Sequence, residues 1–143
     1  MQDHAGAGSR SPFTSAGAPR SGRKIVISGD TAPCQAVEVL AHDADLLVHE
    51  ATFMEEERAR ARETFHTTAY QAAEIARDAG VRLLALTHLS TRYFPRDIRD
   101  EARAVFEPTV VPRDFDEIAV PFPERGEPAL VKPEPEPEPA AVP

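Results

Sequence analysis

The sequence contains a single cysteine, Cys34, and no apolar run long enough to span a bilayer. A lone cysteine cannot form an internal disulfide, which is typical of proteins in a reducing compartment. The amino-terminal segment also lacks the continuous apolar stretch of a secretory signal. We therefore expect a cytoplasmic protein with no membrane association.

An excess of positive charge is lacking as well. The net charge of −8 and the isoelectric point near 5.1 argue against broad electrostatic binding to nucleic acid. Local recognition is a separate matter, because arginines could still gather in a basic patch, although solvated arginines on helix faces are the more common arrangement. The arginines in question are Arg82, Arg92, Arg96, Arg99 and Arg103.

Both ends of the chain are poor in large apolar residues. Residues 1–22 are rich in Ser, Gly, Ala and Arg, and Phe13 is their only aromatic residue. In residues 133–143 prolines alternate with glutamates, a pattern typical of an extended, solvated segment. Neither segment can bury enough surface to offset the entropy of ordering. We predict that both are disordered and that they flank one folded domain over residues 23–132.

Between these ends, strand patterns alternate with helix patterns. Short apolar runs predict buried strands over residues 24–28, 45–49 and 81–87, and two shorter strands over 110–111 and 118–120. Helix patterns cover residues 35–42, 54–62, 68–79 and the stretch after Pro95. Thr68 and Gln71 have the spacing of a capping box, and Gly80 can end the helix that they begin. This alternation predicts an α/β fold.

Polar residues that can carry chemistry follow the predicted strands. Asp30 follows the first strand, His49 and Glu50 follow the second, and His88 follows the third, while His66 precedes the best helix. Each has an ordinary interpretation on its own. Asp30 could cap a turn, His49 could be a hydrogen-bonded core residue, and His66 could be a surface residue. Together, however, they lie where α/β sheets build their sites.

An aspartate and histidines converging from successive strand ends suit a two-metal hydrolase. Zinc favours imidazole nitrogens, and a carboxylate can bridge two ions. Glu50 could orient His66, which would then pass a proton to a leaving oxygen. Asp30 and His88 are nevertheless fewer than the three or so protein ligands that each ion needs.

Four blocks of sequence follow one another in order: Ser28-Gly29-Asp30-Thr31, His49-Glu50-Ala51-Thr52, His66-Thr67-Thr68, and Thr87-His88-Leu89-Ser90-Thr91-Arg92-Tyr93. Together they resemble the carboxyl-terminal half of ribonuclease Z. Ribonuclease Z is the endonuclease of the metallo-β-lactamase superfamily that trims the 3′ end of precursor tRNA. The resemblance runs from about Gly22 to Pro123 and includes Arg113-Asp114-Phe115 near its end.

The resemblance implies a role for each matched residue. Asp30 matches the aspartate that bridges two zinc ions, and His88 matches a terminal zinc ligand. His66 matches the proton donor to the leaving group, and Glu50 matches the acid that pairs with it. A softer match places three residues near the substrate phosphates, namely Ser90, Arg92 and Tyr93. His49 fits a structural role at the strand end.

The chain also departs from the family. The metal motif His-x-His-x-Asp-His is absent, since no two histidines are separated by one residue, and the upstream histidine ligand and the tRNA-binding arm are missing as well. Thr67 replaces the usual serine and keeps its hydroxyl. The resemblance thus implies half of an αββα sandwich, with an apolar sheet face left uncovered. We expect little or no catalysis by the isolated chain, and either homo-oligomers or association with an amino-terminal half.

Three hypotheses remain open at the level of sequence. The chain is the carboxyl-terminal part of a ribonuclease Z, a non-catalytic partner that completes another chain of this fold, or a small α/β protein without metal. The choice between tRNA and another phosphodiester, and between zinc and manganese, stays open too.

Overall fold

The computed structural model describes residues 21–131. The predictions for residues 1–20 and 132–143 lie outside this range. The elements, in chain order, are β1 (Ile25–Ile27), α1 (Gln35–Ala41), β2 (Leu46–Glu50), the 3-10 helix η1 (Glu55–Glu57), α2 (Arg58–Glu63), α3 (Ala69–Asp78), β3 (Leu84–Thr87), α4 (Pro95–Arg103), β4 (Thr109–Val110), β5 (Glu117–Ala119), the 3-10 helix η2 (Pro123–Arg125) and β6 (Ala129–Val131). The predicted α/β fold is confirmed.

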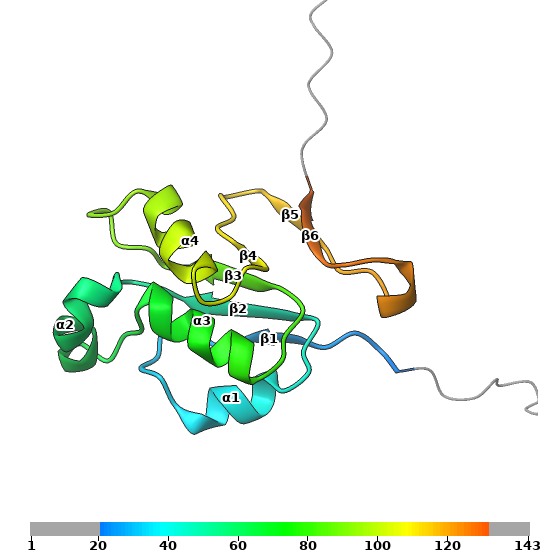
Figure 1. The fold of residues 1–143 in the computed structure, drawn as a ribbon, viewed down its shortest axis with the longest axis horizontal. Coiled ribbons are helices and arrows are strands. Elements are labelled where there is room, and N and C mark those ends of the chain that lie inside the picture. The colour runs from blue at the N-terminus through cyan, green and yellow to red at the C-terminus, as the bar shows by residue number, and fades with distance from the viewer. Residues whose placement is uncertain (1–20, 132–143) are drawn as a thin grey trace, which may run out of the picture.

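A parallel sheet of four strands forms the centre of the molecule, in the order β1-β2-β3-β4 (Figure 1). Its register places Ile27 beside Val48 and Glu50 beside Thr87. Parallel strands need crossover connections, which the helices supply. Because all four strands run the same way, their carboxyl ends meet at one edge of the sheet.

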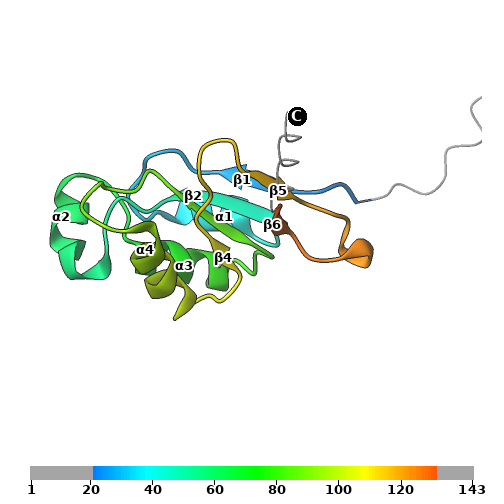
Figure 2. The ribbon, with the colours of Figure 1, turned by 90° about the horizontal axis from the view of Figure 1, so that it is seen from above.

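One face of the sheet is covered by helices. Leu47, Leu84 and Leu86 point to this face and are completely buried in a cluster shared with α1, α3 and α4. Figure 2 shows α3 and α4 on one side of the strands. The alanines of α3 let it approach the sheet closely, since five of its residues are buried: Ala69, Ala72, Ala73, Ile75 and Ala76.

Helix α3 begins and ends as its sequence predicts. The Thr68 hydroxyl accepts a hydrogen bond from the Gln71 N–H, and the Gln71 side chain accepts one from the Thr68 N–H, both at 3.1 Å. This reciprocal pair satisfies two of the N–H groups that a helix start leaves open. Gly80 has a φ of +66°, a left-handed conformation that favours glycine after a helix end.

The opposite face of the sheet is only partly covered. Leu46, Leu83 and Ala85 are buried there, with Ile118 and Val120 packed against them. On β1, in contrast, Ile25 is 53% exposed and Ile27 is 72% exposed. The predicted uncovered apolar face is therefore present at this edge strand.

The structure differs from the sequence prediction in three elements. The predicted helix over residues 54–62 is a 3-10 turn followed by α2, and the Glu101 carboxylate accepts the Glu55 N–H at the start of the turn. The third strand begins at Leu84 rather than Val81. Strand β6 is not predicted from the sequence, since its three residues lie among prolines, and in the structure it pairs with β5 as an antiparallel hairpin. No helix of residues 21–131 is both long and apolar enough to cross a bilayer.

Candidate functional site

The carboxyl edge of the sheet brings together the polar residues that follow its strands. Glu50 is the last residue of β2, while Asp30 and His88 lie in the loops after β1 and β3. His88 has a φ of 54°, so the chain turns sharply as it leaves β3. His66 joins them from the loop before α3, with its ring stacked on that of His88 at 5.3 Å between centroids. Residues far apart in sequence thus form one cluster.

The buried Glu50 carboxylate organises this cluster. One oxygen accepts hydrogen bonds from the Thr31 N–H at 2.9 Å and from His66 Nδ1 at 2.7 Å. The other oxygen accepts from the Thr52 N–H and hydroxyl and from the Thr67 N–H, at 2.8 to 3.2 Å. Burial by itself would raise the pKa of Glu50, but the hydrogen bonds from Thr52, His66 and the backbone lower it further, below its ordinary 4.5. Glu50 is therefore ionised at neutral pH.

His66 is held by this carboxylate in one orientation. Its Nδ1–H donates to Glu50, so Nε2 is the ring nitrogen left for another partner. The His66 side chain is 22% exposed, which gives solvent or a ligand access to the ring. An ionised acid that fixes one ring nitrogen and leaves the other accessible is the arrangement required for proton transfer.

The hydrogen-bond network also fixes the tautomer of His88. The Thr52 hydroxyl donates its one hydrogen to Glu50, so its oxygen accepts from His88 Nδ1–H at 2.8 Å. In the neutral ring the lone pair is then on Nε2, which lies 3.5 Å from a carboxylate oxygen of Asp30. A cation at this point, either a proton on Nε2 or a metal ion, would offset the negative charge of Asp30.

The donor set fits part of a zinc site. Imidazole nitrogen and carboxylate oxygen are ligands that zinc accepts. Within residues 21–131, ligand atoms of Glu50, His66 and His88 lie within 4.8 Å of one another. However, five hydrogen bonds already occupy the Glu50 oxygens, so we assign it to orientation rather than to metal binding. Asp30 and His88 supply the open donors, and two donors do not complete a zinc site.

Residues 7–89 match the model of the β-lactamase superfamily domain, which is more than half of the chain. The chain belongs to the β-lactamase superfamily. The match to this superfamily agrees with a cluster whose donor atoms lie close enough together to hold a metal ion.

Curated relatives and solved structures of the superfamily identify the similar members. The chain is 58% identical over 104 residues to the ribonuclease Z of Gemmatimonas aurantiaca and 46% identical over 108 residues to that of Methanosarcina mazei. These matches cover 71% and 74% of this chain but 33% and 35% of the relatives. The chain thus spans about a third of the length of the curated relatives that it matches.

Two solved structures show the same fold. Human tRNase Z, short form, aligns with a TM-score of 0.57 at 33% identity, over 71% of this chain and 35% of that one. A metallo-β-lactamase fold protein of Bacillus subtilis aligns with a TM-score of 0.57 at 29% identity, over 61% and 35% of the two chains. The resemblance to ribonuclease Z and the metallo-β-lactamase fold are both confirmed.

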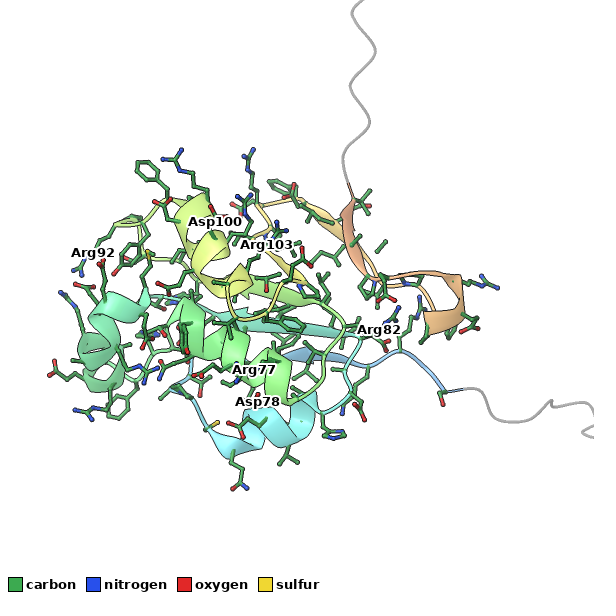
Figure 3. The ribbon with its side chains drawn as sticks, viewed as in Figure 1. Arg77, Asp78, Arg82, Arg92, Asp100 and Arg103 are labelled. Atoms are coloured by element: carbon green, nitrogen blue, oxygen red, sulfur yellow. The ribbon has the colours of Figure 1, made fainter. Side chains whose placement is uncertain are left out.

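The loop after His88 carries the predicted phosphate-binding residues of this superfamily member. Ser90 accepts the Arg92 N–H through its hydroxyl at 3.4 Å. The Arg92 guanidinium and the Tyr93 hydroxyl both donate to Glu57, each at 3.0 Å. Burial and the neighbouring Glu57 raise the pKa of Tyr93. Arg92 lies at the same end of the molecule as α2 (Figure 3), where its guanidinium pairs with Glu57.

Some contributors were not predicted as site residues. Thr52 joins Glu50, His66 and His88 through one hydroxyl, and its place in the block His49-Glu50-Ala51-Thr52 was the only signal. His49 is completely buried, and its Nδ1–H donates to the Glu50 carbonyl at 2.8 Å.

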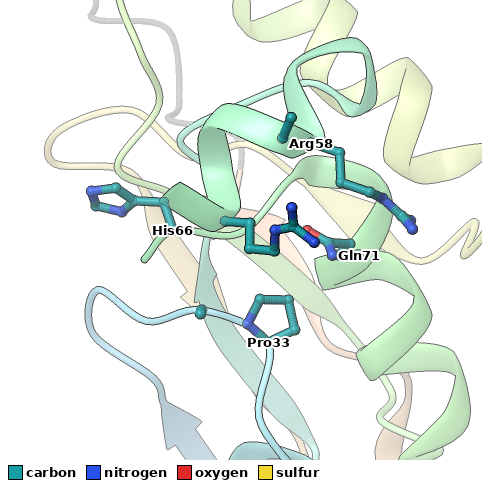
Figure 4. Close-up of a pocket in the computed structure, with 7 residues that line it drawn as sticks. Pro33, Arg58, His66 and Gln71 are labelled. Carbon is teal, nitrogen blue, oxygen red and sulfur yellow. The ribbon is translucent and has the colours of Figure 1, made fainter. Parts of the chain in front are cut away.

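Behind His66 lies a cavity of about 510 Å³, lined by Ala32, Pro33, Arg58, Ala59, Arg62, His66 and Gln71. Figure 4 shows the His66 ring pointing away from Pro33.

Proposed function

We propose that this chain is the carboxyl-terminal part of a zinc-dependent endoribonuclease that hydrolyses a phosphodiester at the 3′ end of precursor tRNA. One observation carries the proposal. The Glu50–His66 pair lies beside the open Asp30 and His88 donors, in a chain 58% identical to a ribonuclease Z. A cytoplasmic location belongs to the same proposal.

In this proposal His66 is the proton donor. The ionised Glu50 holds Nδ1, so Nε2 is the ring nitrogen that would deliver a proton to the leaving oxygen. Asp30 and His88 would hold zinc, which supplies a Lewis acid and lowers the pKa of a bound water. Ser90, Arg92 and Tyr93 would contact substrate phosphates, with Arg92 exchanging Glu57 for a phosphate.

The same geometry supports an incomplete site in this chain by itself. Two open donors bind zinc weakly, so the remaining ligands would come from the amino-terminal half of such an enzyme. The exposed Ile25 and Ile27 favour a covering partner, whether that half or a second copy of this chain. They also favour the second candidate function, a non-catalytic chain that completes another metallo-β-lactamase-fold polypeptide.

The test is to mix the chain with a separately produced amino-terminal region of the Gemmatimonas aurantiaca ribonuclease Z and zinc. Cleavage of precursor tRNA is measured with the wild-type chain and with the Asp30→Asn, His88→Ala and His66→Ala variants. We expect cleavage only by the mixture, and its loss in all three variants. The exposed His42→Ala variant is the control. Zinc binding that is unchanged in the Asp30→Asn and His88→Ala variants would overturn the metal assignment. Association without cleavage would favour the second candidate.

A further inference from the structure

The carboxyl edge of the sheet continues beyond the candidate metal site. Strand β4 lies parallel to β3, so residues 111–113 leave the sheet at the same edge as His88. Helix α4 begins at Pro95, only one residue after Phe94 and close along the chain to Arg92 and Tyr93. Between these two segments lies a groove of about 400 Å³. Its lining residues, here called the arginine groove, are Phe94, Pro95, Arg96, Arg99, Val111, Pro112 and Arg113.

The arginine groove is basic in an acidic protein. Three arginines line it and no acidic residue does, although the chain carries a net charge of −8. Arg96 pairs with Asp97 at 3.3 Å and Arg99 with Asp100 at 2.8 Å, and all four side chains are at least 41% exposed. Exposed pairs of this kind contribute little and can exchange for a phosphate. Within residues 21–131 the Arg113 guanidinium has no ion-pair partner.

An exposed aromatic ring lies beside these arginines. Phe94 is 66% exposed, and the Arg96 guanidinium lies 5.4 Å from the centre of its ring. The exposed face of the ring is free to stack on a flat ligand. Guanidinium groups for phosphates beside an aromatic platform for a base are the chemistry of single-strand recognition. A duplex, whose bases are stacked on one another, does not offer such a base.

We propose that the arginine groove binds a single-stranded RNA segment of the substrate, next to the bond that is cleaved. Arg96, Arg99 and Arg113 contact its phosphates, and Phe94 stacks on one of its bases. The identity of the RNA rests on the proposed function, whereas binding to the groove requires no metal. The shared edge explains the arrangement, because a strand leaving the Asp30–His88 site past β3 meets β4 and the start of α4 next.

The experiment measures fluorescence anisotropy of a labelled, unstructured RNA octamer with the full chain, without metal and at low salt. The Arg96→Ser and Arg113→Ser double variant should weaken binding about tenfold and reduce its salt dependence. Phe94→Ala should weaken it about tenfold, while Phe94→Tyr keeps the affinity. The matched control is the Arg60→Ser and Arg125→Ser double variant, which removes the same charge from α2 and from the turn between β5 and β6 (Figure 1). Neither control arginine lines the groove.

Other outcomes separate this proposal from the proposed function. Equal affinity of the groove variants and the control variant for the octamer would overturn the groove proposal. The proposal would also be overturned if the chain bound an RNA hairpin, or an acidic peptide of the same charge, more tightly than the octamer. Loss of the groove effect, while the mixture with the amino-terminal region still binds zinc and cleaves precursor tRNA, would reject the groove alone. A mixture that binds no zinc and cleaves no precursor tRNA, while the groove effect persists in the chain, would reject only the proposed function.

Discussion

The two ends of the sheet each hold a buried carboxylate, yet they use it differently. At the amino end, Asp45 accepts the Lys24 N–H and the Arg82 guanidinium, both at 2.7 Å. Arg82 also donates to the Pro121 and Gly126 carbonyls, which ties down the β5–β6 hairpin near its position in Figure 3. At the carboxyl end, the Glu50 carboxylate is equally well supplied with hydrogen bonds. Here, however, Nε2 of His66, Nε2 of His88 and the Asp30 carboxylate remain accessible to a ligand.

The comparison shows that hydrogen bonding of a buried acid does not by itself indicate function. The pKa of Asp45 is lowered by the Lys24 N–H and by Arg82, and that of Glu50 by its hydrogen bonds against its own burial. Both shifts report satisfied carboxylates. The difference lies in the partners. The Arg82 guanidinium forms its hydrogen bonds within the fold. His66 and His88 each use one ring nitrogen in a hydrogen bond and leave the other nitrogen accessible.

Removal of the Glu50 carboxylate should have the largest effect. In Glu50→Ala four backbone or hydroxyl donors and His66 lose a buried acceptor, so we expect a loss of about 3 kcal/mol in the free energy of unfolding. Urea denaturation at pH 7 measures it. Glu56→Ala, on an exposed residue of η1, should change stability by less than about 0.5 kcal/mol. Similar losses in both variants would contradict the central role of Glu50.

The two arginines sharpen the comparison between the ends. The Arg82 side chain is 19% exposed and anchors the hairpin, so Arg82→Ala should cost about 2 kcal/mol. The Arg92 side chain is 46% exposed and paired only with Glu57, so Arg92→Ala should cost less than about 1 kcal/mol. Thermal or urea unfolding of the two variants would show equal losses if Arg92 were a structural residue like Arg82.

Thr52→Val tests the tautomer of His88. Valine keeps the shape of threonine but cannot accept the Nδ1–H, so the outward lone pair on Nε2 is no longer fixed. Such supporting contacts are worth about tenfold or more in metal affinity. Zinc titration by calorimetry should show this loss, in the chain completed by its partner if the chain alone binds too weakly. Thr64→Val, at the exposed end of α2, should leave zinc affinity unchanged.

Sequence reasoning predicted elements whose signals are local. The capping box of Thr68 and Gln71 lies within four residues. The predicted strand ends placed Asp30, Glu50 and His88 at one edge of the sheet, although they predicted no distances between these residues. It could not predict what depends on several distant segments. Thr52 meets residues 14 and 36 positions away. The arginine groove joins α4 to residues beyond β4. The sequence analysis grouped arginines from 82 to 103, and nothing in the sequence indicated that Arg113 lies beside Arg96 and Arg99.

Protonation of His49 should have the smallest effect on stability. The pH range of this effect should lie above that of the two buried carboxylates. Burial lowers the pKa of His49 below its ordinary 6.5, so the unfolded chain takes up a proton more readily than the folded chain. Stability is therefore complete above about pH 6.5 and falls as the pH drops toward the folded-state pKa. The pKa values of Glu50 and Asp45 are lowered from 4.5 and 3.8, so their losses begin only near and below those values. In His49→Gln the decline between pH 6.5 and 5 should flatten, as followed by urea unfolding at stepped pH, whereas His42→Gln, on an exposed residue, should keep it. A decline of unchanged slope in His49→Gln would place the pH sensitivity in other groups.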